Sequence, residues 1–512
     1  MKKIQKALIS VSNKKNLEKL LKTLSKHKIE IISSGGTYKK IKKLKFKCTE
    51  ISKYTGFPEI LNGRVKTLHP KIHSGILSKR NNKSHKSDLI KNNFFEIDLV
   101  IVNFYPIENV LLSTNNHSKI IENIDIGGPT MVRAAAKNYK DVTIITNPDQ
   151  YNNLINELNS NKGNTSLNFR KKHSELAFSE TAYYDSLIAN YFSELNNNQF
   201  PQKKTIQLNL IDKLRYGENP HQSSAIYSSK KNLNLKQLHG KKLSYNNFND
   251  IFSSVTISNS FPKNIGIVII KHSNPCGASI EKNPINSYKM ALSCDPISAY
   301  GGIVSCNFKI KKKLAKELKK KFFEVIVAKG FETKALKILK RKKNLRLIDS
   351  SNLKILNSNN YLSNFNAMLI QSPDIQKFRK SEFKVVSKKK PNLNQMKSLK
   401  FAFNICRFVK SNAIVIANNK STFGIGSGQP NRLDSCKIAI EKMNKFNPEN
   451  FENSVAASDA FFPFVDGIEK LVQAGVSAII QPFGSIRDKE IIKFANQTGT
   501  VLVFSKTRHF KH

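Results

Sequence analysis

Short runs of aliphatic and β-branched residues alternate along this chain with segments whose apolar residues recur every three or four positions. The first run covers residues 7–12 and is followed by Leu17, Leu20, Leu21 and Leu24. A short apolar run bounded by polar residues predicts a buried strand, and the helical spacing predicts an amphipathic helix. Because the two patterns keep alternating, we expect an α/β protein with parallel sheets.

The N-terminal part of the chain keeps this alternation up to one long helical segment. Strands are expected at residues 30–33, 98–106 and 142–146, and a closing helix at residues 169–192. The polar stretch 196–205, which contains Pro201, has the composition of a linker. We therefore place a first domain at residues 1–198 and a second at residues 199–512.

The second domain has strands of its own and a lysine-rich interruption. Its clearest strands are expected at residues 265–270, 476–480 and 501–504. A helix is predicted where four apolar residues are in phase, namely Leu399, Phe403, Cys406 and Val409. The stretch 376–400 is rich in lysine and contains one proline, so we interpret it as a surface connection between two subdomains.

Two Gly-Gly turns and one basic loop in the first domain carry candidate anion-binding groups. The turns, residues 34–37 and 124–131, follow apolar runs and precede helices expected to begin near Tyr38 and Met131. Glycine lets the backbone approach a phosphate, and N–H and hydroxyl groups donate to it. The loop at residues 62–70 crowds four donors into six positions: Arg64, Lys66, Thr67 and His69. A plain tight turn and an ordinary basic surface loop remain alternatives.

In the second domain, residues 271–277 read Lys-His-Ser-Asn-Pro-Cys-Gly directly after a predicted strand. Strand ends in α/β proteins are where ligands bind, and the ordinary pKa of histidine suits proton transfer near neutrality. We interpret the turn as stiffened by Asn274-Pro275 and closed by Gly277. At this point a structural turn, with Lys271 facing solvent and His272 as a cap, is an equally good interpretation.

Length and charge limit the function classes. The chain has 512 residues, too many for one core, so about two to four domains are expected. The formal net charge of +48 suggests nucleic-acid binding. The lysines are dispersed, however, and abundant Asn and Ile with no Trp indicate a bias towards A/T-rich codons. We therefore expect no nucleic-acid partner, although the lysines should steer anionic substrates.

Cysteine spacing and hydropathy point to a cytoplasmic protein. None of the six cysteines forms a C-x-x-C pair, which argues against a disulfide framework or a zinc knuckle. The N-terminal apolar run is too short for a signal peptide, and no run approaches the roughly 18 apolar residues of a membrane span. We expect no membrane association and no metal.

Taken together and in order, the motifs resemble the bifunctional purine-biosynthesis family that joins AICAR (aminoimidazole carboxamide ribonucleotide) formyltransferase to IMP cyclohydrolase. The matching stretches are residues 33–37, 63–70, 123–130, 215–222, 271–277, 458–464 and 508–510. The resemblance implies an N-terminal methylglyoxal-synthase-like parallel-sheet domain, which would be the cyclohydrolase, and a C-terminal duplicated cytidine-deaminase-like domain, which would be the transformylase. It also implies an intertwined homodimer with a composite transformylase site. AICAR, formyl-AICAR and IMP would be the ligands, with N10-formyl-tetrahydrofolate as cosubstrate and no metal.

For formyl transfer, the resemblance implies that His272 is the base, that Lys271 stabilises charge and that Asn412 orients the formyl group. The 5-amino group of AICAR is a poor nucleophile because its lone pair is delocalised, so the reaction needs a base and donors to the formyl oxygen. The implied nucleotide and folate contacts are Arg215, Tyr216, Tyr300, Gly301, Gly426, Phe462, Pro482 and Phe483.

For ring closure, the resemblance implies that Lys66, Tyr105, Asp125 and Lys137 manage proton transfers. Backbone N–H groups of residues 125–128 would serve the oxyanion. Attack is intramolecular, so positioning supplies much of the effect. The implied substrate-binding groups are Ser12, Lys14, Ser34, Gly36, Thr37, Arg64, Thr67 and Gly127.

Several positions depart from the family pattern, among them Tyr300, Pro430-Asn431 and Ala328-Lys329, and two other function classes compete. Phe483 stands where glycine is usual and adds bulk beside the implied folate position. A nucleic-acid-binding protein would interleave lysine with aromatic residues on one surface. A zinc deaminase would carry a second cysteine after Cys276 and an H-x-E motif, and both are missing.

Overall fold

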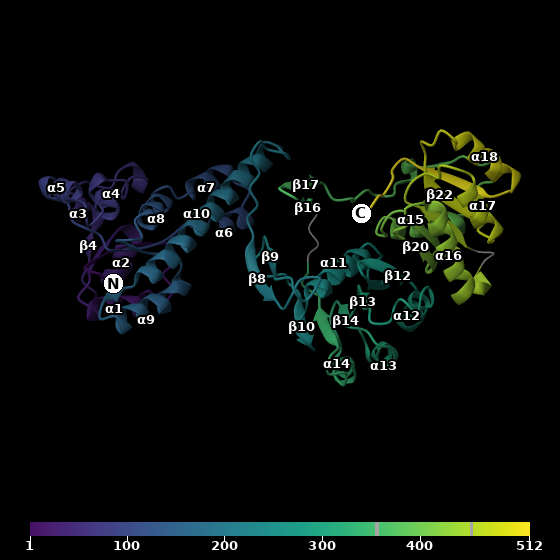
Figure 1. The fold of residues 1–512 in the computed structure, drawn as a ribbon, viewed down its shortest axis with the longest axis horizontal. Coiled ribbons are helices and arrows are strands. Elements are labelled where there is room, and N and C mark those ends of the chain that lie inside the picture. The colour runs from purple at the N-terminus through teal and green to yellow at the C-terminus, as the bar shows by residue number, and fades with distance from the viewer. Residues whose placement is uncertain (354–357, 451–453) are drawn as a thin grey trace. The chain divides into compact units, whose positions relative to one another are not determined.

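The computed structural model describes residues 1–353, 358–450 and 454–512, which form two compact units, Met1–Leu208 and Asn209–His512 (Figure 1). Each unit contains its own sheets and its own hydrophobic core. The α/β class expected from the alternating pattern is confirmed.

Unit 1 is built on a five-stranded sheet in the order β4-β3-β2-β5-β6, and every pair in it is parallel. Its strands are β2 (Lys6–Val11), β3 (Glu30–Ser33), β4 (Thr49–Glu50), β5 (Leu99–Asn103) and β6 (Thr143–Ile145), with a separate pair β1 (Lys2–Lys3) and β7 (Asn164–Thr165). Its helices are α1 (Leu17–Lys26), α2 (Gly35–Lys43), α3 (Ile51–Thr55), α4 (Pro70–Leu77), α5 (Lys83–Lys91), α6 (Ile107–Ser113), α7 (His117–Glu122), α8 (Gly127–Lys137), α9 (Tyr151–Ser160) and α10 (Leu167–Leu195).

The central strand β2 explains why the sequence showed a continuous apolar run there. Leu8 packs into the core on the side of α4, α8 and α10, whereas Ala7 and Ile9 pack into the core on the side of α1 and α9. Successive side chains of a strand point to opposite faces, so a strand covered on both faces is apolar at nearly every position.

Both Gly-Gly turns turned out to be the first turns of helices. Helix α2 begins at Gly35 and α8 begins at Gly127, whereas helices were expected only from about Tyr38 and Met131. Glycine is a poor helix former in a helix interior, but the first turn has no intrahelical partner for its N–H groups. The glycines therefore mark helix N-termini.

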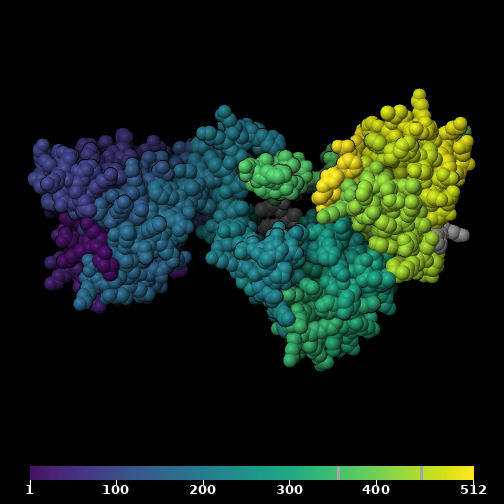
Figure 2. Space-filling model, viewed as in Figure 1, coloured from purple at the N-terminus to yellow at the C-terminus, as the bar shows by residue number. Residues whose placement is uncertain are grey.

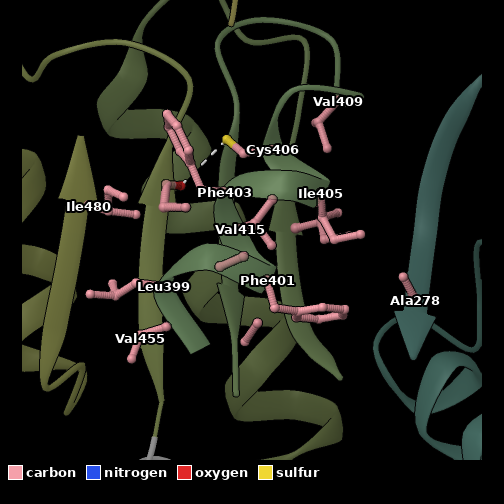
Figure 3. Close-up of a cluster of buried hydrophobic side chains, with 14 of the residues drawn as sticks. Ala278, Leu399, Phe401, Phe403, Ile405, Cys406, Val409, Val415, Val455 and Ile480 are labelled. Carbon is pink, nitrogen blue, oxygen red and sulfur yellow. Dashed lines mark hydrogen bonds between the residues drawn. The ribbon is translucent and has the colours of Figure 1, made fainter. Parts of the chain in front are cut away.

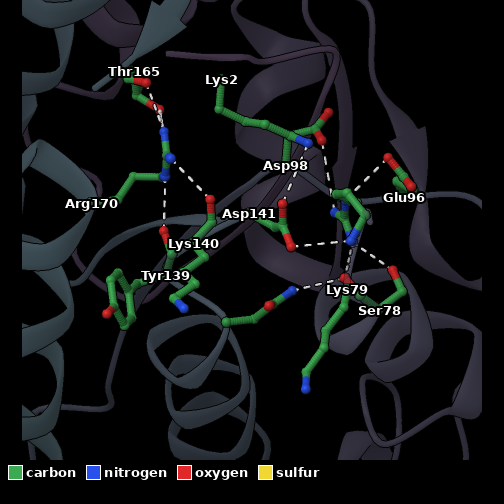
Figure 4. Close-up of polar contacts among 12 residues, drawn as sticks. Lys2, Ser78, Lys79, Glu96, Asp98, Tyr139, Lys140, Asp141, Thr165 and Arg170 are labelled. Atoms are coloured by element: carbon green, nitrogen blue, oxygen red, sulfur yellow. Dashed lines mark hydrogen bonds and ion pairs between the residues drawn. The ribbon is translucent and has the colours of Figure 1, made fainter. Parts of the chain in front are cut away.

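A buried arginine network lies at the amino ends of the inner strands β2 and β5 (Figure 4). The Arg80 guanidinium is 4% exposed, and it pairs with Glu96 at 3.0 Å and donates to the carbonyl of Ile97 at 2.8 Å. The Asp98 carboxylate accepts the N–H groups of Gln5 and Lys6, just before β2. Because each charge has hydrogen-bonding partners, we assign the network to folding and not to catalysis.

Unit 2 contains two six-stranded sheets with the same topology. The orders are β10-β15-β14-β13-β11-β12 and β18-β23-β22-β21-β19-β20, and in each the edge pair is antiparallel, the next two pairs are parallel and the last two antiparallel. We call these the first and second repeats. The expected duplication is confirmed.

The elements of the first repeat are β10 (Lys236–His239), α11 (Tyr245–Asn259), β11 (Ile267–Lys271), β12 (Asn274–Ser279), α12 (Pro284–Ser293), β13 (Ile303–Cys306), α13 (Lys312–Lys320), β14 (Val325–Ala328), α14 (Thr333–Leu339) and β15 (Arg346–Asp349). Those of the second are β18 (Phe383–Val385), α15 (Leu393–Cys406), β19 (Ile414–Ala417), β20 (Thr422–Gly426), α16 (Arg432–Phe446), β21 (Val455–Ser458), α17 (Asp466–Gln473), β22 (Ala478–Pro482), α18 (Asp488–Gln497) and β23 (Val501–Ser505). Outside the repeats lie the hairpins β8 (Asn209–Leu214) with β9 (Ser224–Ser228) and β16 (Asn360–Asn364) with β17 (Ala367–Gln371).

The two repeats share one core (Figure 3). Phe403 and Val415 of the second repeat belong to the same buried cluster as Val268 and Ala278 of the first. Edge strands β12 and β20 meet at Ser279 and Ser421, so the repeats are joined along these edges.

The lysine-rich stretch 376–400 is a connection only in its first part, because the residues from 383 onward belong to the second repeat. Residues 383–385 form β18, an edge strand of the second sheet, and α15 already begins at residue 393. The sequence pattern also missed the β16–β17 hairpin, which stands out in Figure 2 as a green lobe and whose ten strand residues are almost all exposed. A three-residue edge strand with a central lysine, as in β18, does not show the apolar run by which strands are recognised.

Glycines in strands β12 and β20 let helices lie directly on the sheets. A β-carbon on Gly277 would collide with the carbonyl of Ala291 in α12, and one on Gly424 with the carbonyl of Ala439 in α16. Both obstacles are helix backbone, which cannot move aside as a side chain can. Close strand–helix packing is therefore the reason for these glycines.

We expect Gly277→Ala and Gly424→Ala each to lower the free energy of unfolding by about 3 kcal/mol, because the added methyl group overpacks a rigid contact. Gly499→Ala is the matched control: its φ is +66° but no atom lies within 4 Å of its β-carbon position. It should cost only about 1 kcal/mol. Urea unfolding followed by circular dichroism measures all three, and equal losses would contradict the packing argument.

Candidate active sites

The carboxyl ends of β2, β3 and β5 open into a cavity of about 670 Å³ in unit 1. Parallel strands end at the same edge of a sheet, so segments distant in sequence meet there. The structure brings together in its lining the predicted residues Ser12, Lys14, Ser34, Gly36, Thr37, Arg64, Lys66, Thr67, Tyr105, Asp125 and Gly127.

The start of helix α2 forms the most cationic part of this cavity. The Nζ of Lys66 lies 3.5 Å from the point where a β-carbon on Gly35 would be, and the Nζ of Lys14 lies 3.9 Å from the same point on Gly36. The Ser34 side chain makes no cap to this helix, and its hydroxyl lies 3.2 Å from that of Ser10. Two ammonium groups beside free N–H groups at a helix start are the features that favour anion binding.

Asp125 is the titratable group at the start of α8. Its carboxylate accepts the Gly128 N–H at 2.8 Å, and its own N–H donates to the Tyr184 hydroxyl at 2.8 Å. Burial raises the pKa of Asp125, while the N–H groups of Gly128 and Tyr105 and the charge of Lys66 oppose that rise. A half-buried carboxylate with a raised pKa suits a group that exchanges protons.

Existing hydrogen bonds limit which N–H groups of residues 125–128 are available to an oxyanion. Among residues 125–128, the N–H groups of Asp125 and Gly128 are already engaged, so Ile126 and Gly127 supply the remaining donors. Gly127 also lies so close to Thr67 that a β-carbon would meet its Oγ1 at 2.5 Å. The basic loop is therefore pressed against the start of α8.

Lys137 is not brought to this cavity. It is the last residue of α8, whereas the first residue of that helix lines the cavity. Ten residues of α-helix span roughly 15 Å, and the Lys137 side chain is exposed. Its expected catalytic role has no geometric support within unit 1.

Several lining residues were not predicted. Asn103 accepts the Asn13 N–H at 2.8 Å and donates to the Asn13 carbonyl at 3.0 Å, which ties the end of β5 to the loop after β2. Its place at a strand end was a usable signal. No sequence signal identifies apolar lining residues such as Ile124, Met131 and Phe192, because in a sequence they cannot be told from core residues.

In unit 2, Lys271 ends β11 and His272 begins the turn to β12. The Lys271 ammonium donates to the Tyr300 carbonyl at 2.9 Å, and the Tyr300 ring, 64% exposed, lies 5.2 Å from that of Phe322. Gly301 follows with a φ of +74°. Lys271 is therefore held beside the predicted Tyr300-Gly301 stretch.

The expected turn, stiffened by Asn274-Pro275 and closed by Gly277, is wrong. His272 and Ser273 form the two-residue turn, and Asn274, Pro275 and Gly277 lie within strand β12. Proline is tolerated here because β12 is an edge strand of its sheet.

Asn412 reaches the same region from the second repeat. Its side-chain amide donates to the carbonyls of Gln429 and Pro430 at 2.8 and 3.0 Å. Nearby, the Lys410 N–H donates to the Asn274 side chain of β12 at 2.9 Å. The structure thus joins the Asn412 segment to the Lys271–Asn274 hairpin.

Arg215 and Tyr216 lie in the loop after β8, with the Arg215 guanidinium 4.9 Å from the centre of the Tyr216 ring. This loop rests on α11, where the Asn246 side chain donates to the Glu218 carbonyl at 3.2 Å. The start of α11 therefore supports the predicted nucleotide loop.

The remaining predicted residues of unit 2 differ in burial: some are packed in the core and one is exposed. Phe462 is 1% exposed within the core of the second repeat, so it does not form an exposed aromatic slot. A β-carbon on Gly426 would collide with the Ser435 carbonyl of α16, which gives Gly426 a packing role. Pro482 is buried at the end of β22, and Phe483 beside it is 57% exposed.

Known proteins of one family are similar to this chain over nearly its whole length. The AICARFT/IMPCHase bienzyme family model matches residues 135–442, and the MGS-like domain model matches residues 16–130. The chain belongs to the AICARFT/IMPCHase bienzyme family. It is 45% identical over 518 positions to the bifunctional purine biosynthesis protein PurH of Persephonella marina, which covers 99% of this chain and 100% of that protein.

Other relatives of the bienzyme family show the same pattern. The bifunctional purine biosynthesis protein PurH of Leptospira biflexa is 42% identical over all of both chains. The protein of the same name from Bradyrhizobium diazoefficiens is 41% identical, covering 100% of this chain and 99% of that one. Among solved structures, the crystal structure of ForH aligns with 37% of this chain and 99% of its own, at 30% identity and a TM-score of 0.34.

The described residues contain neither a metal-binding cluster nor a membrane-spanning helix. Within residues 1–353, 358–450 and 454–512, no three His, Cys, Asp or Glu side chains are grouped so that they would hold a metal ion. Across that same part of the chain, no helix has the length and hydropathy needed to cross a membrane.

We expect Asp125→Asn to stabilise unit 1 at neutral pH. Burial raises the pKa of Asp125 above its value in the unfolded chain, so ionising this carboxyl opposes folding at neutral pH, and an amide removes that cost. The difference in Tm from the wild type should be largest at neutral pH, shrink as pH falls through the folded-state pKa, and vanish below the ordinary carboxyl pKa. Calorimetry from pH 3 to pH 8 measures it, and an unchanged or lower Tm at pH 7 would contradict it.

Proposed function

We propose that the two units divide two consecutive reactions, with formyl transfer in unit 2 and ring closure in unit 1. The chain is a bifunctional AICAR formyltransferase and IMP cyclohydrolase, which together perform the last two steps of IMP synthesis. The observation that carries the division is the cavity, which gathers the anion-binding and proton-transfer groups of ring closure within unit 1 alone.

In ring closure, the carboxamide nitrogen of formyl-AICAR attacks the formyl carbon and gives up one proton, which passes through Asp125 to the formyl oxygen. The formamide nitrogen then gives up its own proton as it forms a double bond to that carbon, and the oxygen leaves with both protons as water. The start of α2, with Lys14 and Ser34, holds the nucleotide phosphate. Asp125 takes the proton from the carboxamide nitrogen, and Lys66 offsets the charge that this leaves. The N–H groups of Ile126 and Gly127 donate to the formyl oxygen as it becomes negative.

In formyl transfer, the 5-amino nitrogen of AICAR attacks the formyl carbon of N10-formyl-tetrahydrofolate, and the bond from that carbon to N10 breaks. His272 takes the amine proton and returns it to N10 of the leaving tetrahydrofolate. Lys271 stabilises the oxyanion, and the Asn412 amide orients the formyl group. The joined hairpin and Asn412 segment support this arrangement.

We also assign a homodimer with a composite transformylase site. His272 and Tyr300 are exposed on the surface of a single chain, whereas formyl transfer needs a site shielded from water. The β16–β17 hairpin presents exposed Leu362 and Leu369 as register partners on one face. An exposed apolar face of this kind marks a contact surface, and a second copy of the chain would cover it.

Two single substitutions should separate the reactions. His272→Ala should lower formyl transfer about 1000-fold and leave closure of supplied formyl-AICAR unchanged. Lys66→Ala should do the reverse, because it removes a cation from the cavity of unit 1.

The assay follows tetrahydrofolate and IMP separately, without added metal. Loss of both activities in either variant would contradict the division between units.

The proposed homodimer predicts the effect of substitutions in the β16–β17 hairpin. Leu362→Ser with Leu369→Ser should shift the protein to monomers in sedimentation and reduce formyl transfer at least tenfold, with ring closure retained. Ile90→Ser in α5 is the control, because Ile90 is equally apolar and 79% exposed but lies in unit 1. A monomeric wild-type protein that is fully active would overturn the composite site.

A further inference from the structure

The turn that carries His272 has an unfavourable backbone. His272 and Ser273 have φ values of +52° and +61°, and they connect Lys271 to Asn274, which are register partners. A two-residue hairpin loop with both residues at positive φ is a type I′ turn, which strongly favours Asn-Gly. Histidine and serine both pay a steric penalty there. A contact from outside the turn is therefore needed to stabilise this backbone conformation.

Asp250 of helix α11 is in place to do so. Its carboxylate accepts the Ser273 N–H at 2.6 Å and lies 3.4 Å from the Ser273 hydroxyl. Burial raises the pKa of Asp250, and the His272 N–H, which lies near the same carboxylate, opposes that rise. Helix α11 packs against β11 and β13 through buried residues such as Ile251 and Val255, so the carboxylate projects from a rigid support.

The second repeat provides an internal comparison. Counted from the N-cap residues Ser244 and Asn392, Asp250 of α11 corresponds to Ser398 of α15. Ser398 donates to the Asn394 carbonyl within its own helix. The hairpin between β19 and β20 is held instead by its own Asn418, which accepts the N–H groups of Lys420 and Ser421 at 2.8 Å. The carboxylate anchor thus accompanies only the repeat that carries Lys271-His272.

We propose that Asp250 is a positioning residue for formyl transfer. By accepting the Ser273 N–H, with the His272 N–H close by, it keeps His272 and Ser273 at positive φ, which fixes the direction of the His272 imidazole and keeps Lys271 beside Tyr300. The inference rests on the proposed function, because it assumes that His272 is the base. Asp250 itself touches no substrate, so it acts through the turn.

The test compares four proteins with the wild type: Asp250→Ala, Asp250→Asn, Asp250→Ala with Ser273→Gly, and the control Glu317→Ala. Glu317 is a carboxylate of the same unit that pairs with Lys320 on α13, away from the hairpin. The readouts are kcat and KM for formyl transfer, closure of supplied formyl-AICAR, and Tm.

We expect Asp250→Ala to lower kcat for formyl transfer about 100-fold, with KM changed less than threefold and ring closure unchanged, because a misplaced catalytic group costs about that much. Asp250→Asn keeps an acceptor oxygen and should lose about tenfold or less. Adding Ser273→Gly to Asp250→Ala should recover about tenfold, because glycine adopts positive φ without strain. Glu317→Ala should match the wild type.

Three results would overturn the proposal. Full formyl transfer by Asp250→Ala would show that the turn needs no anchor. A parallel loss of Tm and of both activities in Asp250→Ala and Asp250→Asn would indicate a role in folding alone. Absence of rescue by Ser273→Gly would show that Asp250 does not act through the turn. A wild-type protein that makes no tetrahydrofolate would instead remove the proposed function and, with it, this inference.

Discussion

The contact between edge strands β12 and β20 determines where the second active site can form. The Thr422 hydroxyl bonds both the N–H and the carbonyl of Ala278, and the Ile280 N–H donates to the Lys420 carbonyl, so the two sheets are joined edge to edge. The strands run antiparallel, which brings the start of β12 to the end of β20. That is why the hairpin after Lys271 meets the segment of Asn412, although the two are over a hundred residues apart in sequence.

The two candidate sites reflect two kinds of architecture. In unit 1, parallel strands of one sheet end together, so a single domain encloses anion-binding and titratable groups in one cavity. In unit 2, the proposed catalytic groups come from two repeats and lie at their joint, with His272 and Tyr300 exposed. A site of the second kind depends on the relative placement of two cores, and the shared cluster around Phe403 and Ala278 makes that placement rigid.

The sequence predicted those features that depend on local pattern. Apolar runs located β3 and β11 within one or two residues, and the polar residues at strand ends led to most of the cavity of unit 1. Gly35 and Gly127 were placed in turns because glycine disfavours helix interiors, although helix N-termini tolerate it. The anchor of the His272 turn was invisible, because Asp250 lies on a preceding helix and only the tertiary fold brings it near. Phe462 and Gly426 were assigned to ligands, since a sequence motif does not distinguish a side chain that packs from one that binds.

Asn307 and Asp459 occupy equivalent positions in the two repeats but make different contacts. Asn307 follows β13 as Asp459 follows β21. Each donates its N–H to the carbonyl of the residue just before the neighbouring strand, Gly266 before β11 and Ala413 before β19. In the first repeat the Asn307 side chain binds only backbone, accepting from Gly266 and donating to Ser258 and Pro262. In the second, the buried Asp459 carboxylate accepts from Arg432 and from the Ser411 hydroxyl, next to Asn412. An amide suffices to close a fold, whereas a carboxylate can also hold a charged side chain and a functional loop. The two repeats therefore contribute from opposite ends of the same strand of the topology: the first provides the charged hairpin after β11, and the second provides the loop before β19. Neither repeat alone contains both halves of the proposed formyl-transfer site.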